Sequence, residues 1–157
     1  FASGTFRDER STRFYLPIVY ACYAGRMWEV WSAVPEAERQ ILDPDNKVPA
    51  IRKAAAAYLS GDVLGFECNP LDAAMAVAGL GQLGPGRDPG AMGHGLRMLR
   101  DSMGEGPAGH PWGAYEWTLV RYPTRIIVGS PVATSLFALA ACVEAKAWKQ
   151  SGGDAWS

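Results

Sequence analysis

The sequence predicts a mainly α fold: a compact helical domain of five to seven helices with a glycine-rich irregular segment. One short β-hairpin stays an open alternative. The first observation is that Asn69, Asp88 and Ser130 each directly precede a proline, and a good N-cap residue before proline is typical of a helix start. The second is composition, because 48% hydrophobic and 20% charged residues indicate a folded globular domain.

The chain length predicts a single domain. The 157 residues are enough to bury a substantial core, and no linker or internal repeat divides them. We therefore assign 1–157 to one helical domain and expect 1–10 and 151–157 to fray.

The proline, glycine and hydrophobic patterns divide the chain into successive elements. The expected elements are helices over 11–32, 35–42, 49–60 and 70–78, a helix beginning at Asp88, strands over 116–123 and 124–129, and a helix over 131–150. The apolar residues of the first helix cover most of its faces, which predicts that it lies at the centre of the core. Gly61 stands where the third helix is expected to end.

The last helix carries large apolar side chains at helical spacing. They are Val132, Leu136, Leu139 and Val143. Residues spaced in this way share one helix face, and such a face usually packs on the core. The pattern therefore predicts that this stripe is buried.

Residues 79–84, GLGQLG, match the spacing of a dinucleotide-binding loop. That loop requires a strand before the glycines and a helix after them. Here the preceding segment is alanine-rich and helical in pattern, and Pro85 follows the last glycine. We interpret the run as a helix end, with Gly79 or Gly81 in a left-handed conformation.

Two histidines and two arginines are candidate ligand-binding residues. His94, Arg97 and Arg100 recur at one face of the predicted helix after Asp88, and arginine suits carboxylate or phosphate. His110 follows in the glycine-rich segment. The spacing of the histidines matches no metal-ligand pattern, so the sequence predicts neither a metal nor a cofactor.

The three cysteines are too few and too scattered for a disulfide framework, and no C-x-x-C pair occurs. This usage predicts a reducing, cytoplasmic location. Cys68 is a weak candidate for a reactive thiol, because it lies just before a predicted helix N-terminus. Cys22 and Cys142 are expected to be core residues.

Aromatic residues cluster at the end of the glycine-rich segment, in HPWGAYEW. Trp112, Tyr115 and Trp117 combine large apolar surfaces with one polar group each, which suits an interface. Closing the core beneath a loop is the competing interpretation. The candidate binding surface comprises His94, Arg97, Arg100, His110, Trp112, Tyr115 and Trp117.

Net charge and hydropathy limit the partner classes. A formal net charge of −1 and a pI of about 6.1 argue against broad nucleic-acid binding. Residues 14–34 and 126–143 are long apolar stretches, but the first contains Arg26 and Glu29 and the second a Gly-Ser-Pro run. Membrane association is therefore the less favoured interpretation.

These observations favour a non-enzymatic interaction or assembly subunit of a larger bacterial-type complex. A protein partner or a homo-oligomer is expected, bound through the aromatic glycine-rich segment. One alternative is a small enzyme or ligand-binding protein with a pocket around His94, His110, Trp112 and Tyr115. The other alternative is a membrane-associated subunit.

Overall fold

The structure is a computed structural model. It describes residues 15–65, 68–83, 88–104, 106–107, 109–121 and 124–150. The expected frayed ends and the expected start of the first helix at Ser11 lie outside these ranges.

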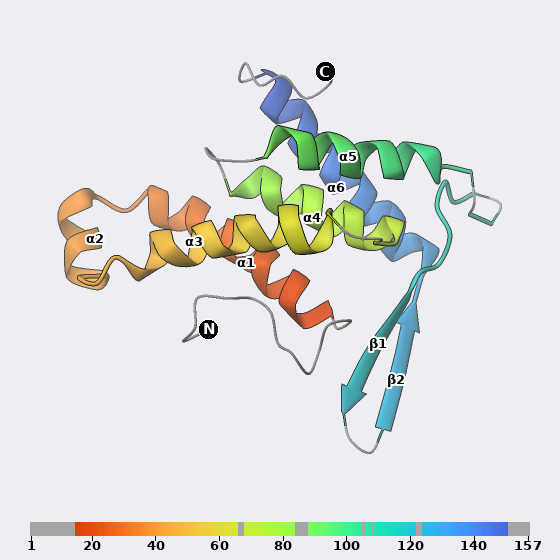
Figure 1. The fold of residues 1–157 in the computed structure, drawn as a ribbon, viewed down its shortest axis with the longest axis horizontal. Coiled ribbons are helices and arrows are strands. Elements are labelled where there is room, and N and C mark those ends of the chain that lie inside the picture. Colours follow the sequence, from red (N-terminus) through yellow and green to blue (C-terminus); the bar gives the residue numbers. More distant parts are fainter. Residues whose placement is uncertain are drawn as a thin grey trace.

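The protein is mainly helical (Figure 1). The elements are α1 (Tyr15–Ser32), α2 (Glu36–Leu42), α3 (Lys47–Ala57), the π-helical turn η1 (Tyr58–Val63), α4 (Pro70–Gln82), α5 (Pro89–Asp101), β1 (Glu116–Arg121), β2 (Thr124–Gly129) and α6 (Pro131–Gln150). Strands β1 and β2 pair antiparallel, from Glu116 opposite Gly129 to Arg121 opposite Thr124.

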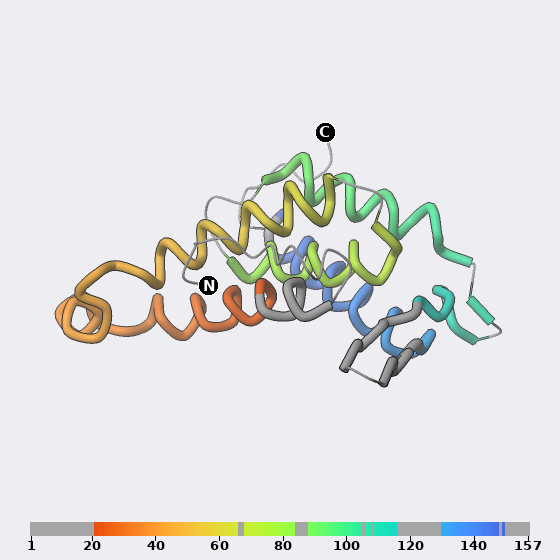
Figure 2. The backbone as a smooth tube through the Cα atoms, turned by 60° about the horizontal axis from the view of Figure 1, so that its bottom comes forward, coloured from red at the N-terminus to blue at the C-terminus, as the bar shows by residue number. Residues whose placement is uncertain are grey.

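Helix α4 lies at the centre of the fold. It contacts α1, α5, α6 and η1, and it passes between α1 and α6 on one side and α3 and α5 on the other (Figures 1 and 2). Every residue from Ala73 to Gly81 is buried. A helix that is apolar on all faces can be stable only when other elements surround it, as they do here.

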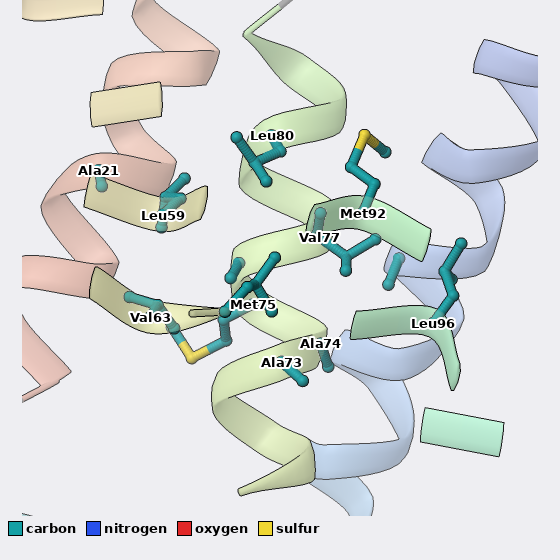
Figure 3. Close-up of a cluster of buried hydrophobic side chains, with 14 of the residues drawn as sticks. Ala21, Leu59, Val63, Ala73, Ala74, Met75, Val77, Leu80, Met92 and Leu96 are labelled. Atoms are coloured by element: carbon teal, nitrogen blue, oxygen red, sulfur yellow. The ribbon is translucent and has the colours of Figure 1, made fainter. Parts of the chain in front are cut away.

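The prediction that the first helix is central was wrong. The second half of α1 is largely exposed, and Arg26 there forms an ion pair with Glu29 at 2.6 Å. Figure 3 shows instead that Ala73, Met75 and Leu80 of α4 lie among buried side chains from several elements. The apolar residues on which that prediction rested belong to a helix whose end projects from the body (Figure 1).

The three predicted N-caps are confirmed. Asn69 Oδ1 accepts from the Asp72 amide at 2.9 Å, and Asp88 Oδ1 accepts from the Ala91 amide at 3.0 Å. Ser130 Oγ lies 3.4 Å from the amide of the third residue of α6. These bonds satisfy backbone donors that the first helical turn leaves free.

The predicted helix end at Gly79 or Gly81 was wrong, because α4 continues through both glycines to Gln82. Both are sites of close helix contact. A methyl group on Gly79 would lie 2.9 Å from Cys22 Sγ, and one on Gly81 would lie against Glu144 of α6. The glycines are therefore spacers between packed helices rather than a phosphate loop or a helix stop.

The third helix also differs from its prediction at both ends. The Asp43 carboxylate accepts hydrogen bonds from the amides of Lys47 and Val48 at 2.8 and 2.7 Å, so α3 begins before Pro49. At the other end Gly61 lies inside η1 and does not terminate the helix.

Arg52 joins three helices at the base of the α1–α2–α3 arm. Its Nε donates to the Leu83 carbonyl just after α4 at 2.6 Å. Its guanidinium lies 4.1 Å from the ring centroid of Trp28 in α1, a cation–π contact. The side chain thus links α3 to both α1 and the end of α4.

Candidate functional site

Helix α6 follows the hairpin directly and is anchored at its N-terminus. The Thr134 hydroxyl donates to the Ser130 carbonyl at 3.2 Å, and the Thr134 amide donates to the same carbonyl at 3.1 Å. These bonds close the first turn of the helix.

The buried side chains among the described residues of α6 are small, and Phe137 packs against the core beside them while partly buried. The buried ones are Thr134, Ala138, Ala141 and Ala145. They face α4, where Ala74, Ala78 and Gly81 share one side of the helix by their spacing. Because a side chain at Gly81 would meet both Cβ and, at 3.0 Å, Cγ of Glu144, the two helices approach too closely for large residues.

Large apolar side chains occupy the opposite face of α6, and they define what we call the α6 stripe: Val132, Leu136, Leu139 and Val143. Each is between 52% and 62% exposed. The prediction that this stripe is buried was wrong, because the alanine face makes the contact with α4. Solvent therefore meets a row of four large aliphatic side chains.

Small, uncharged side chains flank the α6 stripe. Ala133 and Ala140 lie along one side, and Ser135 and the exposed Cys142 lie along the other. From Val132 to Val143 the helix carries no charged residue. A second helix could approach this surface closely without burying an unpaired charge.

A second set of exposed apolar side chains lies on α1 and α2, within the α1–α2–α3 arm. Tyr23, Met27 and Val30 share one face of α1 at spacings of four and three residues. Ile41 and Leu42 are exposed at the end of α2. Single exposed apolar residues are ordinary, whereas these side chains form two ordered rows.

The aromatic glycine-rich segment lies against the helices. Trp112 is half-buried and its Nε1 donates to the Leu99 carbonyl near the end of α5 at 2.8 Å. Tyr115 is also half-buried and packs against the core. The turn before them closes through the Gly104 amide, which donates to the Pro111 carbonyl at 2.7 Å. The side chain of Trp117 lies outside the described part of the structure.

We expect Trp112→Ala to lower the free energy of unfolding by roughly 2–3 kcal/mol, because it removes a half-buried ring and leaves the Leu99 carbonyl without its indole donor. Chemical denaturation measures this change. A loss below about 0.5 kcal/mol would show that the ring contributes little to the core.

The polar candidates do not form one cluster around Trp112. His94, Arg97 and Arg100 are exposed on α5, and Arg100 forms an ion pair with neighbouring Asp101 at 2.8 Å. His110 is half-buried in the turn, where its amide donates to the Pro107 carbonyl at 2.9 Å. The three α5 residues thus present a solvated, basic helix face.

The start of α4 gathers titratable side chains that the sequence reasoning did not bring together. Burial raises the pKa of Cys68 to about 11, with a further increase from Asp72. Burial also raises the pKa of Tyr58 to about 12, helped by the negative charges of Asp62 and Asp72. Both groups are therefore protonated near neutral pH, and neither is activated as a nucleophile.

The three cysteines occupy different environments. Cys22 is half-buried and its thiol donates to the Met75 carbonyl at 3.2 Å, while burial raises its pKa to about 12. Cys68 is half-buried, with Sγ 3.7 Å from Met98 Sδ. Cys142 is exposed, so its prediction as a core residue was wrong.

Iodoacetamide at pH 7.5 should therefore modify Cys142 at least ten times faster than Cys22 or Cys68. The thiolate is the reacting species, and the raised pKa values of the two half-buried thiols keep its population small. Peptide mass spectrometry over time gives the three rates. If Cys68 were modified first, the result would contradict this order and make Cys68 a candidate reactive thiol again.

Within the described part of the chain, none of the helices has the length and apolar character needed to cross a membrane. No three His, Cys, Asp or Glu side chains among the same residues come together as a metal-binding group. In comparisons with family models, curated proteins and solved structures, nothing matches this chain.

Proposed function

We propose that this chain is an interaction or assembly subunit that binds a protein partner through the α6 stripe. The observation that carries the proposal is the orientation of α6, which turns its alanines inward and its large aliphatic residues outward. Ordered rows of exposed apolar side chains on a folded domain typically mark interaction sites. A cytoplasmic location, expected from the cysteine usage, belongs to the same proposal.

Another protein surface that covers the stripe would remove its apolar side chains from water, which is favourable. Burying one aliphatic side chain of this size is worth about 1.5–3 kcal/mol when fully exposed beforehand, and these four are more than half exposed. The small side chains beside the stripe leave room for a helix to pack along it. Contact with a protein surface would thus contribute several kcal/mol of favourable free energy to binding.

The proposal moves the binding surface away from the aromatic glycine-rich segment. Trp112 and Tyr115 already pack against the core, and the indole N–H of Trp112 already donates to the Leu99 carbonyl. The Cys68 thiol has a raised pKa, which weakens an enzymatic role for it. These contacts favour an interaction protein over the small-enzyme alternative.

The test compares particle size in an extract of the source cells. We expect the tagged native chain to elute well above its own 16.9 kDa, and a Leu136→Glu/Leu139→Glu variant to elute as the monomer. Ile41→Glu is the matched control, because it places the same charge on an exposed aliphatic position of α2.

Two results would contradict the proposed function. One is a native chain that elutes as a monomer in the extract. The other is an assembly that survives the double substitution on α6 but dissociates with Ile41→Glu, which would place the interface on the arm.

A further inference from the structure

The α6 stripe has the spacing of a coiled-coil seam. Its four members are separated by four, three and four residues, the alternating spacing of the apolar positions in a heptad repeat, which keeps one helix facing another. The face that packs on α4 lies on the other side of the helix. A partner helix can therefore lie along the stripe without displacing the contact between α6 and α4.

The stripe also reads the same in both directions. Its order is Val, Leu, Leu, Val, and its midpoint falls between Phe137 and Ala138. If a second α6 lies antiparallel across it, Val132 meets Val143 of the second copy, and Leu136 meets Leu139. A two-fold axis through the midpoint generates all four contacts, as a self-complementary interface requires.

We propose that the partner of the α6 stripe is a second copy of this chain, paired antiparallel through α6. This inference rests on the proposed function, since it names the protein that the stripe binds. The resulting dimer has one apolar layer for each residue of the stripe and no connection to the arm.

The charges along α6 favour this partner and this direction. The seam from Val132 to Val143 is neutral, so two copies do not repel each other there. Lys146 and Lys149 are exposed in the last turns. A parallel pair would bring these lysines together, whereas an antiparallel pair places them at opposite ends of the interface. Antiparallel helices also align their dipoles favourably.

A lipid surface is the competing occupant, and the flanks disfavour it. Helices that lie on membranes carry lysine and arginine beside the apolar face to contact headgroups. Alanine, serine and cysteine occupy the corresponding positions here, at Ala133, Ala140, Ser135 and Cys142. Small flanking residues suit close helix–helix approach instead.

The area of the stripe sets the expected strength of the dimer. Each half-exposed aliphatic side chain presents on the order of 100 Å² at most, so the stripe offers roughly 400 Å² per copy. Stable interfaces bury about 800 Å² per partner. The α6 pair is thus at the small end, and we expect a reversible dimer that forms in the range of about 1–100 μM.

Sedimentation velocity of the purified chain tests the pairing with charge-complementary variants. The native chain should shift from 16.9 kDa to twice that mass as its concentration rises. Leu136→Glu alone and Leu139→Lys alone should each stay monomeric, because a charge is buried against a leucine. Mixing the two variants should restore a dimer, since the new carboxylate at position 136 then faces the new ammonium at position 139.

The mixing result separates antiparallel from parallel pairing. In a parallel pair, position 136 meets position 136 and position 139 meets position 139, so the mixture would gain no ion pair. If the native chain forms a dimer but the mixture of the two variants does not, the proposal is overturned. Ile41→Glu should dimerise like the native chain, and circular dichroism should show all variants folded, because the substituted positions are exposed.

The remaining outcomes separate this inference from the proposed function. A chain that is monomeric when pure at 200 μM but part of a larger particle in the cell extract overturns self-pairing and leaves the proposed function standing. A monomer in both overturns both. Stripe-dependent binding to phosphatidylglycerol vesicles by a chain that stays monomeric overturns the pairing in favour of a lipid surface.

Discussion

Gly81→Ala is expected to lower the free energy of unfolding by about 2–3 kcal/mol, although alanine is ordinarily the better helix former. The added methyl group would lie against Glu144 Cβ and 3.0 Å from Glu144 Cγ. The position of Glu144 Cβ is set by the α6 backbone, so this atom cannot rotate away as a side-chain tip can. Helices α4 and α6 must therefore separate, which opens the central contact of the fold.

Gly61→Ala is the matched control for this substitution. It makes the same chemical change in a helical segment, but nothing lies within 4 Å of the added methyl group. We expect no loss of stability, and a gain of up to about 1 kcal/mol from reduced freedom of the unfolded chain. If both variants lose equal stability in chemical denaturation, close approach at Gly81 is not the cause.

Leu80→Ala is expected to cost about 3–5 kcal/mol, because Leu80 is fully buried on the central helix and its truncation leaves a cavity. Leu139→Ala removes the same atoms from the α6 stripe. In dilute solution, where the chain is monomeric, we expect a loss below about 0.5 kcal/mol. Urea denaturation of both variants at 1 μM measures the contrast.

The leucine pair also tests the orientation of α6 directly. Had the stripe been buried as its spacing suggested, Leu139→Ala would cost nearly as much as Leu80→Ala. Equal losses at 1 μM would therefore contradict the rotation of α6 that places alanines against α4.

Helix starts were predictable from sequence because their chemistry is local. Asn69, Asp88 and Ser130 each cap the amide three residues further along the chain, so the necessary partners are visible in the sequence itself. Helix ends were less predictable. Gly61 and Gly81 fit a stop signal, but contacts with other elements decide whether the helix continues.

The buried face of α6 could not be predicted from α6 alone. Two stripes recur at helical spacing, one of large aliphatic residues and one of alanines with Thr134, and periodicity cannot rank them. The deciding residue is Gly81, which lies on another helix and sets how closely α6 approaches. A sequence signal does exist, because glycine and alanine at matched spacings on two helices indicate close packing.

The candidate site moved from the aromatic glycine-rich segment to α6 for the same reason: contacts with other helices decide which apolar face is buried. Trp112 and Tyr115 suited both an interface and a core, and the structure packs them against the helices. The α6 stripe was visible as a pattern but was assigned to the core. What the sequence lacked was the direction in which each apolar face points, since that depends on contacts between distant segments.

Labelling of a cysteine placed within the stripe tests the central claim most directly. The chain would carry Leu139→Cys with Cys142→Ser, so that the remaining native thiols react slowly. At 1 μM we expect modification as fast as that of an unfolded peptide, and at 200 μM, or in the cell extract, at least fivefold protection. Slow modification at every concentration would show that the stripe faces the core. Equally fast modification under all conditions would show that nothing covers it.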